Sequence, residues 1–135
     1  MVDEVVLSKV AVIERCLARI REEYHGDPAR LEDLTVEDSI VLNLQRACEA
    51  SIDIAMRIVS RGRLGLPQDS RAAFELLRTT ALLTDSLTER MKRMVGFRNI
   101  AVHDYTQLSR GILIAILDER LADFEEFCRA AVSAH

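Results

Sequence analysis

Apolar residues recur three or four positions apart along most of this chain, with polar residues between them. This spacing gathers the apolar side chains on one face of an α-helix, because successive helical residues are rotated by about 100°. In the first segment, residues 3–24, the stripe consists of Val6, Val10, Ile13, Leu17, Ile20 and Tyr24. The same pattern predicts helices over residues 35–60, from 69 or 70 to about 81, from 86 to about 102, and over 109–132.

The second predicted helix should lie at the centre of the fold, because it has the longest apolar face. Its main stripe consists of Ile40, Leu44, Ala47, Ser51, Ile54 and Ile58. No strand-like alternation, internal repeat or low-complexity stretch occurs in the sequence. We therefore predict an all-α fold, a single domain over residues 1–135 built as an antiparallel bundle of four long helices and one short helix.

Local signals place the ends of these helices. The first should end near residues 25–28, where Gly permits a left-handed cap and Pro prevents continuation. His25 suits the last turn of that helix, and a catalytic role is its alternative. Capping-box-like pairs open the second and fourth helices: Thr35 with Asp38, and Ser86 with Glu89. The short third helix should begin at Asp69 or Ser70 and carry Phe74, Leu77 and Ala81.

Composition narrows the class of protein. A chain of 135 residues with 49% hydrophobic residues is long enough for one domain with its own core. No run of about 18 apolar residues occurs and no apolar segment follows a basic N-terminus, so we expect a cytoplasmic protein without a membrane span or signal peptide. Three widely separated cysteines, Cys16, Cys48 and Cys128, lie within apolar helical patterns. They are expected to be core residues, and not disulfide partners or metal ligands.

The charge is unevenly distributed along the chain. Residues 1–56 hold 12 acidic and 6 basic residues, a net charge of −6, and residues 111–135 contribute −3. Residues 57–110 hold 5 acidic and 10 basic residues, a net charge of +5, within a total of −4. Nearly all of these bases are arginines, whose planar guanidinium binds phosphate well. A basic middle segment therefore favours an anionic partner, with a solvated arginine-rich surface as the alternative.

The densest cluster of reactive side chains lies in this basic segment, over residues 97–105, read F-R-N-I-A-V-H-D-Y. Leu87, Met91 and Met94 form an apolar stripe whose next position is Arg98, so a guanidinium on a buried face has to be neutralised or used. His103 follows five residues later, about 140° away around a continuous helix. For the two to act on one substrate, the helix must distort near Val102 or a second chain must supply a partner.

A pair of carboxylates offers a second candidate site. Glu49 and Asp53 lie four residues apart on the second predicted helix, a spacing that suits a metal ion or an arginine. A solvated pair, or one bonded to Arg46 or Arg57, is the simpler interpretation. We therefore expect no metal site and no cofactor.

The motif R-N-I-A-V-H-D-Y, preceded by M-V-G-F at the end of the penultimate long helix, resembles the signature of the HEPN superfamily of helical ribonucleases. The tyrosine two residues after the histidine resembles the HepT branch, the toxins of HepT/MntA toxin–antitoxin pairs. The segment L-Q-R-A-C-E-A-S-I-D-I-A and the loop L-G-L-P are similar to that branch too, so the resemblance covers most of the chain.

The resemblance implies a metal-independent endoribonuclease, the toxin of a type VII-like system, that works as a homodimer with two motifs facing each other across a cleft. It implies that Arg98 grips the scissile phosphate, His103 acts as base or acid, and Asn99 orients the histidine or a phosphate oxygen. His103 is also the one well-placed group whose ordinary pKa, about 6.5, suits proton transfer at neutral pH. Candidate RNA contacts are Arg93, Arg110 and Lys92.

The resemblance further implies that an MntA-like nucleotidyltransferase antitoxin transfers AMP from ATP to Tyr105. The added phosphates would compete with RNA for the same cations. Two alternatives stay open. In the first, the chain is a non-catalytic helical adaptor that binds nucleotides or a nucleotidyltransferase. In the second, Arg98 and His103 only cap the helix, and Tyr105 packs under the loop.

Overall fold

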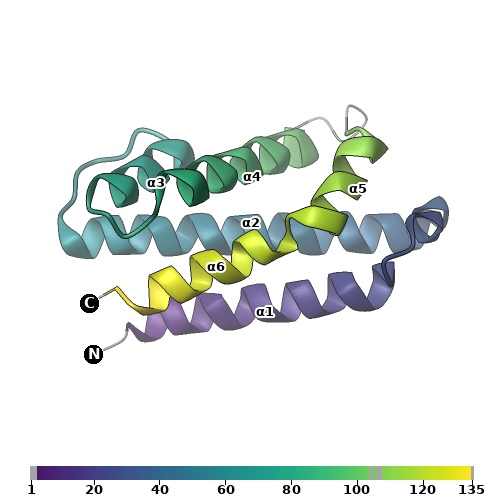
Figure 1. Ribbon diagram of the computed structural model, residues 1–135, viewed down its shortest axis with the longest axis horizontal. Helices are drawn as coiled ribbons and strands as arrows, with labels where there is room; N and C mark the ends of the chain where they lie inside the picture. The colour runs from purple at the N-terminus through teal and green to yellow at the C-terminus, as the bar shows by residue number, and fades with distance from the viewer. Residues whose placement is uncertain (1–2, 104, 106–107, 135) are drawn as a thin grey trace.

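A pair of long antiparallel helices forms the frame of the molecule in the computed structural model, which describes residues 3–103, 105 and 108–134. These helices are α1, Glu4–Tyr24, and α2, Leu34–Gly62, and a short 3₁₀ helix, η1 at Pro28–Glu32, joins them (Figure 1). The helix α2 packs against α1, α3, α4, α6 and η1. Its central place confirms the expectation drawn from its long apolar face.

The second half of the chain packs around α2. Helices α3, Ser70–Thr79, and α4, Asp85–His103, lie on one side of it, and α6, Leu121–Val132, packs against α1, α2 and α4 (Figure 1). Helix α5, Arg110–Glu119, lies at one end of the bundle and contacts α6. Every regular element in the described part of the chain is a helix, which confirms the all-α bundle.

Side chains cap most of these helices. Asp3 caps α1 and Asp69 caps α3, as their oxygens accept hydrogen bonds from Val5 N and Ala72 N, both at 2.8 Å. His25 ends α1 in the left-handed conformation, with a φ of 54°, so it is the helix-end residue that the sequence indicated. A histidine tolerates this conformation better than most residues do.

Three predicted boundaries were wrong. Asp33 caps α2, accepting from the backbone N–H of Thr35 at 2.9 Å, so Thr35 lies inside the helix. Thr84 precedes α4 and accepts from the Leu87 N–H at 3.1 Å, so Ser86 lies inside that helix. Ala81 lies beyond α3, exposed and with a φ of 62°. In the first two cases an oxygen two residues earlier satisfies the free N–H groups first.

The single predicted helix over 109–132 is divided in two at Arg120, which has φ −120° and ψ −2°. The apolar stripe explains the break. Leu113, Leu117 and Leu121 are spaced four apart, so on a straight helix each would be rotated by about 40° from the one before. The break lets all three stay buried while α6 turns along the bundle (Figure 1).

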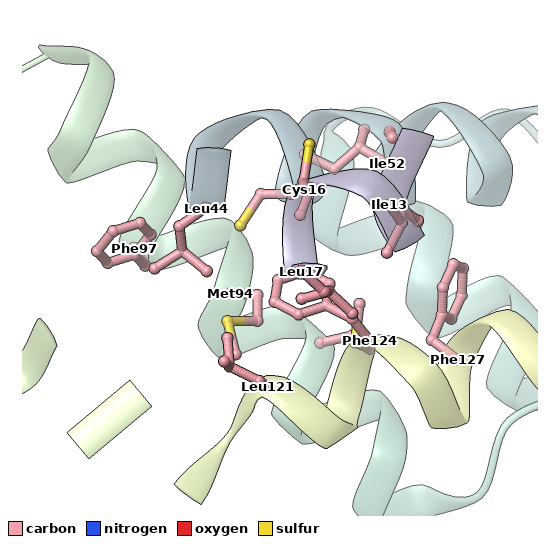
Figure 2. Close-up of a cluster of buried hydrophobic side chains, with 14 of the residues drawn as sticks. Ile13, Cys16, Leu17, Leu44, Ile52, Met94, Phe97, Leu121, Phe124 and Phe127 are labelled. Carbon is pink, nitrogen blue, oxygen red and sulfur yellow. The ribbon is translucent and has the colours of Figure 1, made fainter. Parts of the chain in front are cut away.

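The core lies between α1, α2, α4 and α6. Figure 2 shows part of it, with Leu17 from α1, Leu44 from α2, Met94 from α4 and Phe124 from α6 gathered in one cluster. All three cysteines are free and buried, which confirms them as core residues. None of the helices in the described ranges is long and apolar enough to span a membrane.

Candidate functional site

Arg98 lies where three helices meet. It follows the buried residues Leu87, Met91 and Met94 on the inner face of α4. Its Nη2 donates to Ser70 Oγ at 3.1 Å, at the start of α3, and its Nε lies 3.4 Å from Glu49 Oε1 on α2. The side chain is only 19% exposed. The predicted cation on a buried face is thus partly neutralised by Glu49.

The contacts of Arg98 are incomplete for a buried cation. Its Nε is buried and forms no hydrogen bond with any described residue, although Glu49 Oε1 lies 3.4 Å away as an ionic partner. A buried donor without an acceptor usually indicates a site that serves something other than stability. The Ser70 hydrogen bond and the Glu49 contact hold the guanidinium in one orientation, and an oriented planar guanidinium can bind phosphate through two N–H groups.

His103 is the last residue of α4, which continues as an α-helix to that point. The helix does not break at Val102, so that alternative was wrong. On this regular helix His103 lies about 140° around the axis from Arg98. The histidine side of the helix is exposed, whereas the arginine lies on the inner side. One chain therefore does not bring the two side chains to one point.

The other predicted site residues differ in their exposure and in their ion pairs. Asn99 is half-buried and Arg93 is exposed, both on α4. Lys92 Nζ lies 3.1 Å from Glu75 Oε2, and Arg110 Nη2 lies 3.0 Å from Glu37 Oε2. Lys92 and Arg110 are thus engaged by carboxylates, which leaves Arg93 as the more accessible of the predicted RNA contacts.

Tyr105 is placed beside the start of α2. Its hydroxyl donates to Asp38 Oδ1 at 2.8 Å, and 42% of the residue is exposed. Partial burial, the bond to Asp38 and the negative charges of Asp38 and Glu37 raise the pKa of Tyr105 to about 12. The tyrosine is neither packed under the loop nor free, and Asp104 beside it lies outside the described residues.

The two carboxylates considered as a metal pair have different partners. Glu49 contacts Arg98, and Asp53 Oδ2 lies 3.0 Å from Lys9 Nζ. Both carboxylates are about half exposed, as a solvated pair would be, whereas the alternative partners Arg46 and Arg57 were wrong, because Arg57 bonds to Asp3. No group of three or more metal-binding side chains occurs among residues 3–103, 105 and 108–134.

A groove of about 440 Å³ lies between α4 and α5, beside the motif. Its apolar lining includes Met94, Phe97, Ile100, Leu108 and Ile112, and arginines also line it: Arg71, Arg90, Arg93 and Arg120. The sequence did not single out Arg71, on α3, and Arg120, between α5 and α6, because they lie beside Arg93 only in the folded chain. Asp123 lines the groove as well, and Arg90 is paired with it and with Glu126, so the groove is an apolar surface with mixed charges around it.

Comparisons with known proteins give this geometry a context. A family profile described as "Ribonuclease HepT-like" matches residues 13–131. The chain is 45% identical over 125 residues to the mRNA nuclease HepT of Shewanella oneidensis, covering 93% of this chain and 94% of that protein.

Solved structures of toxin–antitoxin complexes contain similar chains. One complex, with AMP-PNP, contains a chain that is 44% identical, with a TM-score of 0.90, covering 95% of this chain and 97% of that one. The tri-AMPylated HEPN toxin of Shewanella oneidensis, in complex with MNT antitoxin, matches with 45% identity and a TM-score of 0.90, covering 95% of this chain and 96% of the matched chain.

Proposed function

The chain belongs to the HepT-like ribonuclease family, and on that premise we propose that it is the toxin of a toxin–antitoxin pair, a ribonuclease that an antitoxin silences by AMP transfer. The observation that carries this proposal is the 45% identity to an mRNA nuclease over nearly the whole of both chains. A similar toxin is AMPylated and bound to its MNT antitoxin. The partner proposed for this chain is therefore an MntA-like nucleotidyltransferase, and its substrate is RNA.

In the proposed reaction Arg98 binds the scissile phosphate and His103 transfers the proton. Cleavage needs a base for the ribose 2′-OH, an acid for the leaving oxygen, and positive charge near phosphorus. The fixed guanidinium of Arg98 suits the last role, because Ser70 and Glu49 already hold it in place. Asn99, next to Arg98 on α4, is proposed to orient the histidine or a phosphate oxygen.

The active species is proposed to be a homodimer. His103 and Arg98 lie on different sides of α4, so a single chain offers a phosphate site and a proton-transfer group that do not face each other. A two-fold dimer pairs the Arg98 of one chain with the His103 of the other, and supplies both an acid and a base. A monomer with full activity, seen by sedimentation at the assay concentration, contradicts this part of the proposal.

We propose that the cleavage is metal-independent, because these protein groups supply the proton transfers and the positive charge. Glu49 and Asp53, the carboxylates with metal-binding spacing, are each paired with a cation of the chain. AMP transfer to Tyr105 would add phosphate two residues after His103 in the chain. The added negative charge would compete with RNA for Arg93 and Arg98.

The test is cleavage of bulk RNA in EDTA by the purified protein and by His103→Ala. The chain provides a matched control, His25→Asn, which replaces an exposed histidine far along the sequence with a residue that tolerates the left-handed conformation. We expect the wild type and His25→Asn to cut and His103→Ala to lose at least about 100-fold in rate. Treatment with the nucleotidyltransferase and ATP should silence the wild type.

Failure of each part has its own outcome. If His103→Ala cuts as fast as the wild type, His103 has no catalytic role. If no variant cuts RNA while Tyr105 still accepts AMP, the chain is an adaptor for the nucleotidyltransferase and not a ribonuclease. The total charge of −4 is compatible with that second function, because nonspecific RNA binding depends on phosphate neutralisation.

A further inference from the structure

The hydroxyl of Tyr105 is held by one carboxylate. Its Oη donates to Asp38 Oδ1 at 2.8 Å, across 67 residues of sequence. Asp38 lies near the start of α2 and is exposed, and Tyr105 is 42% exposed, so both groups are open to an approaching enzyme. The distance lies within the range of about 2.6–3.2 Å that a general base needs.

The neighbouring charges leave the Asp38 carboxylate available. Glu37, the other acid facing Tyr105, is engaged by Arg110, whose Nε and Nη2 lie 3.2 and 3.0 Å from Glu37 Oε2. Asp38, by contrast, forms no ion pair with any residue that the structure describes. Asp38 therefore faces Tyr105 as a hydrogen-bond acceptor, and no cation among the described residues pairs with it.

We infer that Asp38 is the proton acceptor when Tyr105 is AMPylated, an inference that rests on the function proposed above. The Tyr105 oxygen attacks the α-phosphorus of ATP and forms the new O–P bond. The bond from that phosphorus to the bridging oxygen breaks, and pyrophosphate leaves. The phenolic proton moves to Asp38 and from there to solvent, so the toxin itself supplies one catalytic group for its own modification.

Tyr105 needs such a group because it ionises with difficulty. Burial, the bond to Asp38 and the acidic neighbours raise its pKa to about 12. At pH 7 roughly one molecule in 10⁵ would then carry a tyrosinate. Transfer of the proton to a carboxylate during attack avoids that rare species, and protein kinases use an Asp to accept the substrate hydroxyl proton in this way.

The experiment measures the rate of AMP incorporation from ATP labelled at the α-phosphate, with the cognate nucleotidyltransferase and the full-length chain. The variants are Asp38→Asn, which keeps a hydrogen-bond acceptor but cannot take the proton, Asp38→Ala, and Asp38→Glu. The matched control is Glu37→Gln, which removes the neighbouring carboxylate that does not bond to Tyr105. A thermal melt of each variant shows that the comparison is made between folded proteins.

We expect Asp38→Asn and Asp38→Ala to slow AMP incorporation about 100-fold, with Asp38→Glu partly restored and Glu37→Gln close to the wild type. The ratio of the Asp38→Asn rate to the wild-type rate should rise about tenfold per pH unit from pH 7 to 9, because the variant depends on tyrosinate. A hydrogen bond that only positions the ring would leave this ratio constant.

Two outcomes overturn the inference alone. One is labelling of Asp38→Asn at the wild-type rate or faster, and the other is slow labelling with a ratio that does not change with pH. If wild-type Tyr105 accepts no AMP at all, the proposed mode of silencing falls and this inference falls with it. The wild-type arm therefore separates the two failures.

Discussion

Replacing Arg98 separates its contacts with neighbouring helices from the phosphate-binding role that we propose for it. Arg98→Ala removes the hydrogen bond to Ser70 Oγ and the ionic contact with Glu49. Arg98→Lys keeps the positive charge but loses the planar guanidinium that binds a phosphate through two N–H groups. The two variants should therefore differ in stability and agree in activity.

The contacts set the size of the stability change. The bond to Ser70 has a charged donor and contributes about 1.5–3 kcal/mol. Glu49 is 45% exposed, so its contact adds at most about 1 kcal/mol, and water can solvate it in the variant. The buried Nε without a hydrogen bond opposes these terms. We expect Arg98→Ala to lose about 2 kcal/mol of unfolding free energy, and Arg98→Lys about 1 kcal/mol.

A typical domain has a total stability of about 5–15 kcal/mol, so both variants should stay folded. RNA cleavage should nevertheless fall at least about 100-fold in both, because each variant lacks the guanidinium that is proposed to stabilise the charge at phosphorus. Ser70→Ala is the matched control. It removes the same hydrogen bond but keeps the guanidinium and its Glu49 contact, so it should share most of the stability loss and lose less activity than Arg98→Ala.

The assay combines urea unfolding, followed by circular dichroism, with RNA cleavage at a protein concentration at which every variant is folded. Wild-type cleavage by Arg98→Lys would refute the role proposed for the guanidinium. If Arg98→Ala were unfolded without urea, the contacts of Arg98 would contribute far more to the free energy of unfolding than about 2 kcal/mol. If Ser70→Ala were as inactive as Arg98→Ala, the orientation of the guanidinium would be decisive.

Three further predictions concern stability and reactivity. Tyr24→Phe should cost about 1.5 kcal/mol in urea unfolding at pH 7, because the hydroxyl donates to Asp118 Oδ1 at 2.7 Å. Burial and that bond raise the pKa of Tyr24 to about 12, compared with about 10 in the unfolded chain. The contribution of Tyr24 to the free energy of unfolding is therefore full below pH 10 and is lost as the pH rises to 12. The Tyr24→Phe variant should not show this loss. Arg90→Met should lower the free energy of unfolding by about 3 kcal/mol, because Asp123, which is only 4% exposed, then lacks its contact with Arg90 Nη1 at 2.6 Å. Replacing Asp123 by Asn in the same chain should recover part of this loss. A thiol reagent should label none of the three buried cysteines in the native protein within the time that it needs to label all three in urea. The reason is that burial blocks access to the thiols and raises their pKa. Rapid labelling of the native protein would contradict this packing.

The pattern of apolar residues predicted the helices well because helical periodicity is a local property. Each residue identified on the core face of the first helix is buried, from Val6 to Tyr24, and α2 is central as expected. The prediction of a single helix over 109–132 was wrong, because the break at Arg120 depends on packing against the rest of the bundle. No Gly or Pro, the residues that most often end a helix, lies at that break.

The candidate site was only partly accessible from the sequence. Spacing alone put Arg98 on the inner side of its helix, next to Met94, and the structure agrees. Spacing alone also separated Arg98 from His103, and the continuous α4 keeps them apart. The catalytic and RNA-binding roles of these residues stay predictions, to be settled by the cleavage assays.

The sequence by itself thus determined which face of each helix is buried, where the reactive cluster lies and which family the motif resembles. Only the tertiary structure decided the partners of that cluster: Ser70 and Glu49 for Arg98, and Asp38 for Tyr105. The reason is physical. Rotation around one helix follows from about 3.6 residues per turn, whereas a contact between helices depends on how whole helices cross and slide in the packed core.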